Sequence, residues 1–128
     1  MIFDSDVLMW FLRGESNAVD LIDATADRSL SIVSLMETLQ GAKSKPEMRM
    51  VRELFREATF QVIPLNESIG HVAASLIEEH SLNSGLQVAD ALIAATALGA
   101  GDVLVTANVK HFRPIRSLQL MGFHARRG

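Results

Sequence analysis

Four polar residues interrupt otherwise apolar or β-branched stretches of the chain, and three of them are carboxylates. Asp4 follows Ile-Phe, Glu37 lies within Leu-Met-Glu-Thr-Leu, Asp90 lies within Val-Ala-Asp-Ala-Leu-Ile, and Asn108 follows a β-branched run that ends at Thr106. Carboxylates that share one cleft repel one another, and each raises the pKa of its neighbours. A bound divalent cation offsets that repulsion. If the fold gathers these side chains, the set predicts a metal site.

The available ligand types indicate which metal such a site would take. The chain has no cysteine, and its four histidines show no ligand spacing. Oxygen ligands alone suit Mg²⁺, with Mn²⁺ as a substitute, rather than zinc. A metal held by carboxylates can activate water for attack on phosphorus and offset charge on the scissile phosphate. The predicted chemistry is phosphodiester hydrolysis.

Alternating strands and helices would position these residues. Periodicity and capping signals predict strands over 2–3, 30–33, 61–65, 103–105 and 118–120. They predict helices over 7–12, 16–28, 67–80 and 88–98, the third of which is capped by Asn66. Two further helices are expected: one is capped by Ser34 and ends near Gly41, and the other starts at Pro46. Residues 81–87 are predicted to form a polar loop. This alternation favours an α/β fold whose mostly parallel sheet carries helices on both faces.

In a parallel sheet the carboxyl ends of the strands meet at one edge, where ligands bind. Asp4, Glu37 and Asn108 each come after a predicted strand, so we expect them to share that edge. Asp90, at the start of a buried helix, can point to the same edge. Taken singly, Asp4 and Asp90 are also ordinary helix-capping residues, and Asn108 is an ordinary turn residue.

Length and composition exclude several other classes. The chain has 128 residues, of which 48% are apolar, so we expect a single domain over 1–128. Absence of cysteine excludes disulfides, zinc ribbons and thiol nucleophiles, and it suits a cytoplasmic protein. The longest apolar stretch is interrupted by Asp90 and is too short to span a bilayer, so no membrane association is expected.

Charge is distributed unevenly along the chain. Residues 1–102 carry a formal net charge of −8, whereas residues 103–128 carry +5 and no acid. Lys110, His111 and Arg113 lie just after Asn108, where positive charge would attract a phosphate backbone. A solvated basic segment without function is an equally good interpretation of Lys110 and Arg113, and for His111 a surface or core role is the better interpretation.

Taken together, these motifs resemble the PIN-domain nucleases, specifically the small VapC-type toxin ribonucleases of type II toxin–antitoxin systems. The resemblance covers essentially the whole chain. It depends on four stretches in the same order: Asp4-Ser5-Asp6-Val7-Leu8, Ser34-Leu35-Met36-Glu37, Val88-Ala89-Asp90-Ala91-Leu92-Ile93-Ala94-Ala95-Thr96-Ala97, and Val105-Thr106-Ala107-Asn108-Val109-Lys110-His111-Phe112.

The resemblance implies a three-layer α/β/α fold with a central sheet of four to five strands. It also implies an acidic Mg²⁺ site built from Asp4, Glu37 and Asp90, with Thr106 and Asp6 in support. Asn108 stands where the family commonly has Asp, which lowers the negative charge of the site by one. Further implications are an RNA substrate, a homodimer and inhibition by a small antitoxin protein that lays an amphipathic segment across the toxin.

The sequence therefore predicts a Mg²⁺-dependent endoribonuclease, with Asp4, Glu37, Asp90 and Asn108 as metal ligands and Thr106 assisting. A catalytically silent PIN module that binds RNA or protein is the alternative, and Asn108 favours it slightly. A phosphoacceptor domain of the receiver type is a weaker rival. It needs an aspartate after the central strand, whereas the 61–65 strand is followed by Asn66.

Overall fold

The computed structural model describes residues 1–126 and contains a five-stranded sheet in the order β3-β2-β1-β4-β5. Every neighbouring pair of strands is parallel. The strands are β1 Ile2–Phe3, β2 Ser29–Ser31, β3 Gln61–Ile63, β4 Leu104–Thr106 and β5 Leu120–Gly122. The helices are α1 Ser5–Leu12, α2 Ser16–Ala24, α3 Ile32–Gln40, α4 Lys45–Glu57, α5 Glu67–Ser84, α6 Val88–Ala100 and α7 Val109–Phe112. The predicted α/β class and parallel sheet are confirmed.

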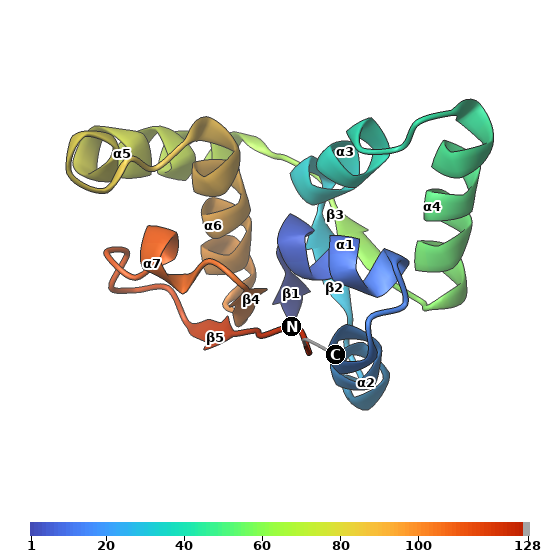
Figure 1. Cartoon of the computed structure of the whole chain (residues 1–128). Helices are drawn as coiled ribbons and strands as arrows, with labels where there is room; N and C mark the ends of the chain where they lie inside the picture. The colour runs from blue at the N-terminus through green and yellow to red at the C-terminus, as the bar shows by residue number, and fades with distance from the viewer. Residues whose placement is uncertain (127–128) are drawn as a thin grey trace.

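Helices cover both faces of the sheet, as Figure 1 shows, with α5 and α6 on one side and α1, α2 and α4 on the other. Successive strand residues point to opposite faces. Ile2 and Leu104 therefore join the core under α5 and α6, whereas Phe3 and Val105 join the core under α1 and α2. This arrangement confirms the predicted three-layer architecture.

Local capping chemistry explains where several helices begin and end. Asn66 caps α5 by accepting a hydrogen bond from the N–H of Ile69, and Pro46 lies in the first turn of α4, both as the sequence predicts. Gly101 ends α6 with a φ of 62°, a left-handed conformation that glycine adopts without strain. Within residues 1–126, no helix is both long and apolar enough to cross a membrane.

The predicted boundary between β2 and α3 is wrong by three residues. The strand ends at Ser31, and α3 begins at Ile32 rather than after Ser34. Ser31 is the capping residue, since its hydroxyl accepts a hydrogen bond from the N–H of Val33 at 3.1 Å. Two serines at helical spacing present equivalent capping signals, and tertiary packing selects the first. Ser34 instead lies buried inside the helix.

Further predicted boundaries are corrected by the structure. The helix predicted over 16–28 stops at Ala24, and the strand predicted over 118–120 lies at Leu120–Gly122. The polar segment predicted as a loop over 81–87 is helical as far as Ser84, after which Gly85 ends α5 with a φ of 70°. The polar residues there are compatible with a helix because Asn83 is exposed and the Ser84 hydroxyl donates to the carbonyl of His80 at 2.9 Å.

Candidate active site

Asp4 is the most buried carboxylate of the site and is positioned by the end of β1. It directly follows Phe3, and its N–H donates to the carbonyl of Val105 on β4 at 2.8 Å. Its side chain accepts hydrogen bonds from the N–H of Ser5 at 2.8 Å and from the hydroxyl of Thr106 at 2.7 Å. Asp4 therefore caps α1 and still lies at the strand edge that the sequence predicts, with 7% of its surface exposed.

Burial raises the pKa of Asp4 from its ordinary 3.8 to about 7. Repulsion from Asp6 adds to this rise, and repulsion from Asp90 adds a smaller part. The hydrogen bonds from Thr106 and Ser5 oppose it, because they stabilise the charged form. Among residues 1–126, no lysine, arginine or histidine forms an ion pair with Asp4. The carboxylate therefore lacks a countercharge of its own.

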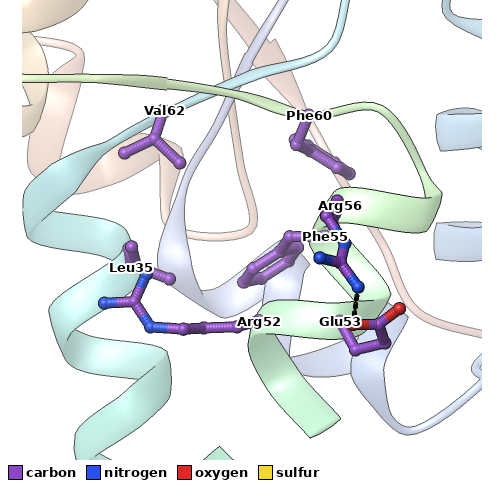
Figure 2. Close-up of a pocket in the computed structure, with 7 residues that line it drawn as sticks. All are labelled: Leu35, Arg52, Glu53, Phe55, Arg56, Phe60 and Val62. Atoms are coloured by element: carbon purple, nitrogen blue, oxygen red, sulfur yellow. Dashed lines mark hydrogen bonds and ion pairs between the residues drawn. The ribbon is translucent and has the colours of Figure 1, made fainter. Parts of the chain in front are cut away.

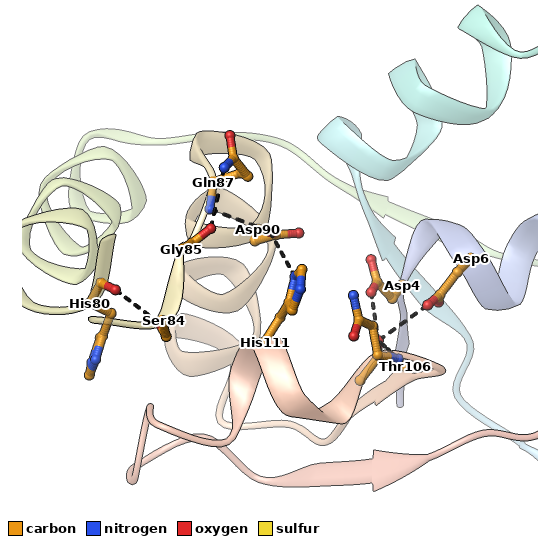
Figure 3. Close-up of polar contacts among 10 residues, drawn as sticks. Asp4, Asp6, His80, Ser84, Gly85, Gln87, Asp90, Thr106 and His111 are labelled. Carbon is orange, nitrogen blue, oxygen red and sulfur yellow. Dashed lines mark hydrogen bonds and ion pairs between the residues drawn. The ribbon is translucent and has the colours of Figure 1, made fainter. Parts of the chain in front are cut away.

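Thr106, at the end of β4, connects Asp4 with a second carboxylate, Asp6 (Figure 3). Its hydroxyl lies 2.7 Å from Asp4 and 3.5 Å from Asp6, so its single proton goes to Asp4. Asp6 accepts the N–H of Ala107 at 3.1 Å, which ties α1 to the loop after β4. Burial raises the pKa of Asp6 as well. The N–H of Asn108 donates to the Thr106 hydroxyl at 3.0 Å and completes this network.

Glu37, on α3, reaches the site through Ser5. The Ser5 hydroxyl donates a hydrogen bond to Glu37 Oε1, while the Ser5 backbone N–H donates to Asp4. One residue thus bridges the two carboxylates. The structure brings Asp4 and Glu37, which are 33 positions apart in the chain, to opposite sides of a single serine.

Asp90, in the first turn of α6, faces the site from the other side of the sheet edge (Figure 3). Its carboxylate accepts the N–H of Gln87 at 3.4 Å as part of a capping box and lies 3.8 Å from Nδ1 of His111. The Asp90 side chain is 24% exposed. His111 is therefore placed at the site rather than in the core, in contact with a predicted metal ligand.

The remaining predicted residues surround the site on and before α7. Asn108 precedes α7, and its side chain is exposed and makes no capping hydrogen bond. Lys110 and Arg113 are exposed on and just after this short helix, and neither forms an ion pair within residues 1–126. The basic segment is thus free to meet an anionic ligand beside the carboxylates.

The donor chemistry of this edge suits a hard divalent cation. Its charged groups are four carboxylates, one of them buried without a countercharge, and its neutral donors are hydroxyl and amide oxygens. In residues 1–126, no three His, Asp or Glu side chains converge closely enough to enclose a metal ion by themselves. Mg²⁺ commonly keeps several waters and takes only one or two carboxylates directly, so the residues fit such an ion with water completing its shell.

Sequence reasoning missed Ser5, which carries the contact between Asp4 and Glu37. It assigned Asp6 only a supporting role, and the structure shows what that residue holds: the N–H of Ala107 in the loop after β4. The position of Ser5 between two acids was the available signal. A hydroxyl between carboxylates is a common helix-capping pattern, however, and its partner 32 residues away is invisible in a linear sequence.

A family model supports these assignments of fold. The model of the PIN domain matches residues 1–116. No curated protein matches the chain.

Solved structures show the same fold. A toxin–antitoxin complex from Klebsiella pneumoniae contains a chain 27% identical to this one, with 91% of this chain and 93% of that chain covered and a TM-score of 0.77. The VapBC2 structure from Rickettsia felis, bound to a promoter DNA fragment, gives a TM-score of 0.80 at 21% identity and covers 97% of this chain and 100% of that chain. The DNA-bound VapBC structure from Salmonella typhimurium gives 0.79 at 21% identity, with 94% and 96% covered. The family match over 116 residues, on this fold, shows that the chain belongs to the PIN-domain family.

Proposed function

We propose that the protein is a Mg²⁺-dependent endoribonuclease, acting in the cytoplasm as the toxin of a toxin–antitoxin pair. The observation that carries the proposal is the buried Asp4 carboxylate, which is repelled by Asp6 and Asp90, shares Ser5 with Glu37, and has no cationic partner in residues 1–126. A buried anion of this kind is costly unless a cation or a proton neutralises it. Family membership and the toxin–antitoxin complexes among the similar structures support the assignment.

Each residue of the site has a distinct role in this proposal. Asp4, Glu37 and Asp90 would hold the cation directly or through water. Asn108 contributes an amide oxygen. When bound, the metal supplies an activated water and offsets charge on the scissile phosphate.

Two further residues prepare the site without reacting. The Thr106 hydroxyl stabilises the charged form of Asp4, so that this carboxylate is available to a cation near neutral pH. Asp6 holds the N–H of Ala107 and thereby places Asn108 and the basic side chains beyond it. Lys110, His111 and Arg113 then contact the phosphates of RNA on either side of the scissile bond.

RNA cleavage by the purified chain tests the proposal. A fluorophore-quencher RNA should be cut with Mg²⁺ or Mn²⁺ and left intact in EDTA, and Asp4→Ala and Asp90→Ala should each remove the activity. Equal activity in these variants would exclude both residues from the mechanism. A matched DNA oligonucleotide, expected to remain uncut, separates ribonuclease from general nuclease activity.

The family resemblance also leads us to propose an antitoxin partner and a homodimer. A small protein encoded beside this chain should bind it and suppress RNA cleavage. Light scattering coupled to gel filtration should give twice the 14.0 kDa mass of the chain. A mass of one chain across the micromolar range would contradict the homodimer but leave the nuclease proposal intact.

A catalytically silent PIN module remains the second candidate, and Asn108 is the observation that favours it. An amide in place of a carboxylate lowers the negative charge of the site, and with it the affinity for a cation. Melting curves distinguish the two candidates. A metal-binding site should raise the melting temperature as Mg²⁺ is added, whereas a silent module should show no divalent-specific rise.

A further inference from the structure

A polar hollow of about 610 Å³ lies between the end of α5 and the segment 114–117 that follows α7. Leu76 of α5 and Ile115 line it and are buried in the core on the α5 and α6 side of the sheet, so they give the hollow an apolar floor. Hydrogen-bonding side chains line much of the rest: Glu79, His80 and Asn83 of α5, and Arg116. The hollow thus combines an apolar base with a polar rim.

The packing face of α5 changes from apolar to polar at this hollow. Ile69, Ala73 and Leu76 are buried at helical spacing, and the same spacing continues at His80 and Asn83. The His80 side chain is 14% exposed, whereas Asn83 is exposed. The helix therefore presents hydrogen-bonding groups where simple packing against the core would need apolar ones.

Hydrogen bonds fix both walls of the hollow. The Ser84 hydroxyl donates to the carbonyl of His80 at 2.9 Å and holds the last turn of α5. On the other wall, the N–H of Ile115 donates to the carbonyl of Phe112 at 3.0 Å, and the N–H of Leu118 donates to the carbonyl of Ile115 at 3.2 Å. The hollow is therefore formed before a ligand arrives.

The segment after Asn108 leads from the carboxylates to the hollow. His111 lies 3.8 Å from Asp90, and in the view of Figure 3 it stands between Asp4 and His80 of α5. Three residues later, at Pro114, the chain lines the hollow. The hollow and the candidate active site are therefore neighbours along one short stretch of backbone.

Two arginines on this stretch can guide a phosphate backbone. Arg113 and Arg116 are exposed on either side of Pro114, and in the part of the chain that the structure describes neither forms an ion pair. Guanidinium groups suit phosphate, and their attraction for it does not depend on base sequence. A single strand that follows them would carry a nucleoside from the carboxylates to the hollow.

We propose that the hollow binds one nucleoside of RNA, with the base inside and the flanking phosphates on Arg113 and Arg116. That this RNA is the substrate rests on the proposed ribonuclease function. A base has apolar faces and a hydrogen-bonding edge, which match the apolar floor and the polar rim. The Glu79 carboxylate repels phosphate, so the hollow takes the base and leaves the phosphates to the arginines.

The rim favours a base with an exocyclic amino group. An ionised Glu79 only accepts hydrogen bonds, so it suits the amino group of adenine, cytosine or guanine and repels the carbonyl oxygens of uracil. The Asn83 amide both donates and accepts, so it can pair with the next atom along the edge of the base. The hollow is therefore a specificity-determining subsite rather than a second attachment point for phosphate.

Binding of short RNAs in EDTA tests the inference without any cleavage. A fluorescent heptauridine is compared by anisotropy with seven variants, each of which carries one adenosine at a different position. We expect adenosine at one position to lower the Kd at least about fivefold relative to heptauridine. Asn83→Ala and Glu79→Gln should each remove this preference while heptauridine still binds.

Arg116→Ala tests the phosphate contact separately. It should weaken binding of all eight RNAs alike and lower the slope of log Kd against log salt concentration by about 0.7, the value for one phosphate on a single strand. Arg52→Ala is the matched control. Arg52 is also exposed and without an ion pair in residues 1–126, but it lines a groove between α3, α4 and β3 on the other face of the sheet (Figure 2). It should change neither the preference nor the slope.

Three outcomes would overturn the proposal: no positional preference for adenosine, a preference that survives both Asn83→Ala and Glu79→Gln, or no binding of any RNA. All the substituted side chains are exposed, and melting temperatures confirm that the variants fold. Failure of the proposed function gives a different result. An RNA that binds with this preference but stays intact with Mg²⁺ and Mn²⁺ would contradict the nuclease and leave the nucleoside subsite standing.

Discussion

In two regions of this molecule the pKa of a carboxylate is shifted in opposite directions. On α4, Glu53 is exposed and hydrogen-bonded to Arg56, and this bond lowers the pKa of Glu53. At the carboxyl edge of the sheet, Asp4 is buried without an ion pair in residues 1–126, and burial raises its pKa to about 7. The first region contains its own countercharge, whereas the second requires a proton or an external cation. The two regions thus differ in whether the fold itself supplies a cation to the carboxylate.

The difference is produced by position in the fold rather than by residue type. A carboxylate on an exposed helix meets an arginine three residues away at little cost to the core. The end of the central strand β1 offers Asp4 hydroxyl and N–H donors, and within residues 1–126 no basic side chain pairs with it. Asp4 therefore receives the Thr106 hydroxyl and the Ser5 N–H, which stabilise its charge only in part.

Substitution at Asp4 should have the largest effect. Asp4→Asn keeps the size of the side chain and removes the charge, so Mg²⁺-dependent RNA cleavage should fall at least about 100-fold. In EDTA the same variant should be at least as stable as the parent protein, because the buried charge is gone. Asp20→Asn, an exposed position on α2, is the matched control and should change neither rate nor melting temperature.

The pH dependence of metal binding should follow the raised pKa of Asp4. A carboxyl group whose pKa is raised in the folded state contributes its full stability below about 3.8 and loses it as the pH rises through about 7. The melting temperature in EDTA should therefore fall between about pH 4 and pH 7 through this group, and Mg²⁺ should reverse the fall.

Protons compete with the metal for this carboxylate, so the apparent Kd for Mg²⁺ should rise by up to about tenfold for each pH unit below 7. Isothermal titration calorimetry at several pH values measures this. A Kd that is constant between about pH 5 and pH 8 would show that Asp4 does not bind the metal. The same titration on Asp4→Asn supplies the baseline.

Removal of the Thr106 hydroxyl should have an intermediate effect. Thr106→Val leaves Asp4 without its 2.7 Å hydrogen bond and the N–H of Asn108 without its acceptor. Loss of a buried hydrogen bond costs about 1–3 kcal/mol, and loss of support for a metal-binding carboxylate typically costs about 10- to 100-fold in activity. Chemical denaturation and RNA cleavage report the two effects, and Thr106→Ser should restore most of both.

The smallest effect is expected on α4. Glu53→Gln breaks an exposed pair with Arg56, so the free energy of unfolding should change much less than it does in Thr106→Val, and less again at high salt. Urea denaturation at low and high ionic strength measures this. A loss comparable to that of Thr106→Val would mean that the surface pair matters as much as the buried network, and the contrast between the two regions would fail.

Much of the architecture was predictable from sequence because it follows from local periodicity. The apolar runs at residues 2–3 and 103–105, the stripe of α5 and the Ala-rich α6 identify strands and helices without knowledge of their partners. Alternation of the two then leaves few arrangements other than a parallel sheet. The boundaries at Ser31 and Ser84 were predicted wrongly, because competing caps and exposed polar turns differ too little in local free energy.

The sequence alone thus determined the class of fold, the order of its elements and the acidic residues that reach the carboxyl edge of the sheet. Only the tertiary structure decided which of those residues touch: Ser5 between Asp4 and Glu37, Thr106 between Asp4 and Asp6, and His111 beside Asp90. Periodicity is a property of neighbouring residues, and the chain records it directly. Contacts across 21 to 102 positions depend on how the layers pack, and the burial and the pKa of the carboxylates depend on that packing too.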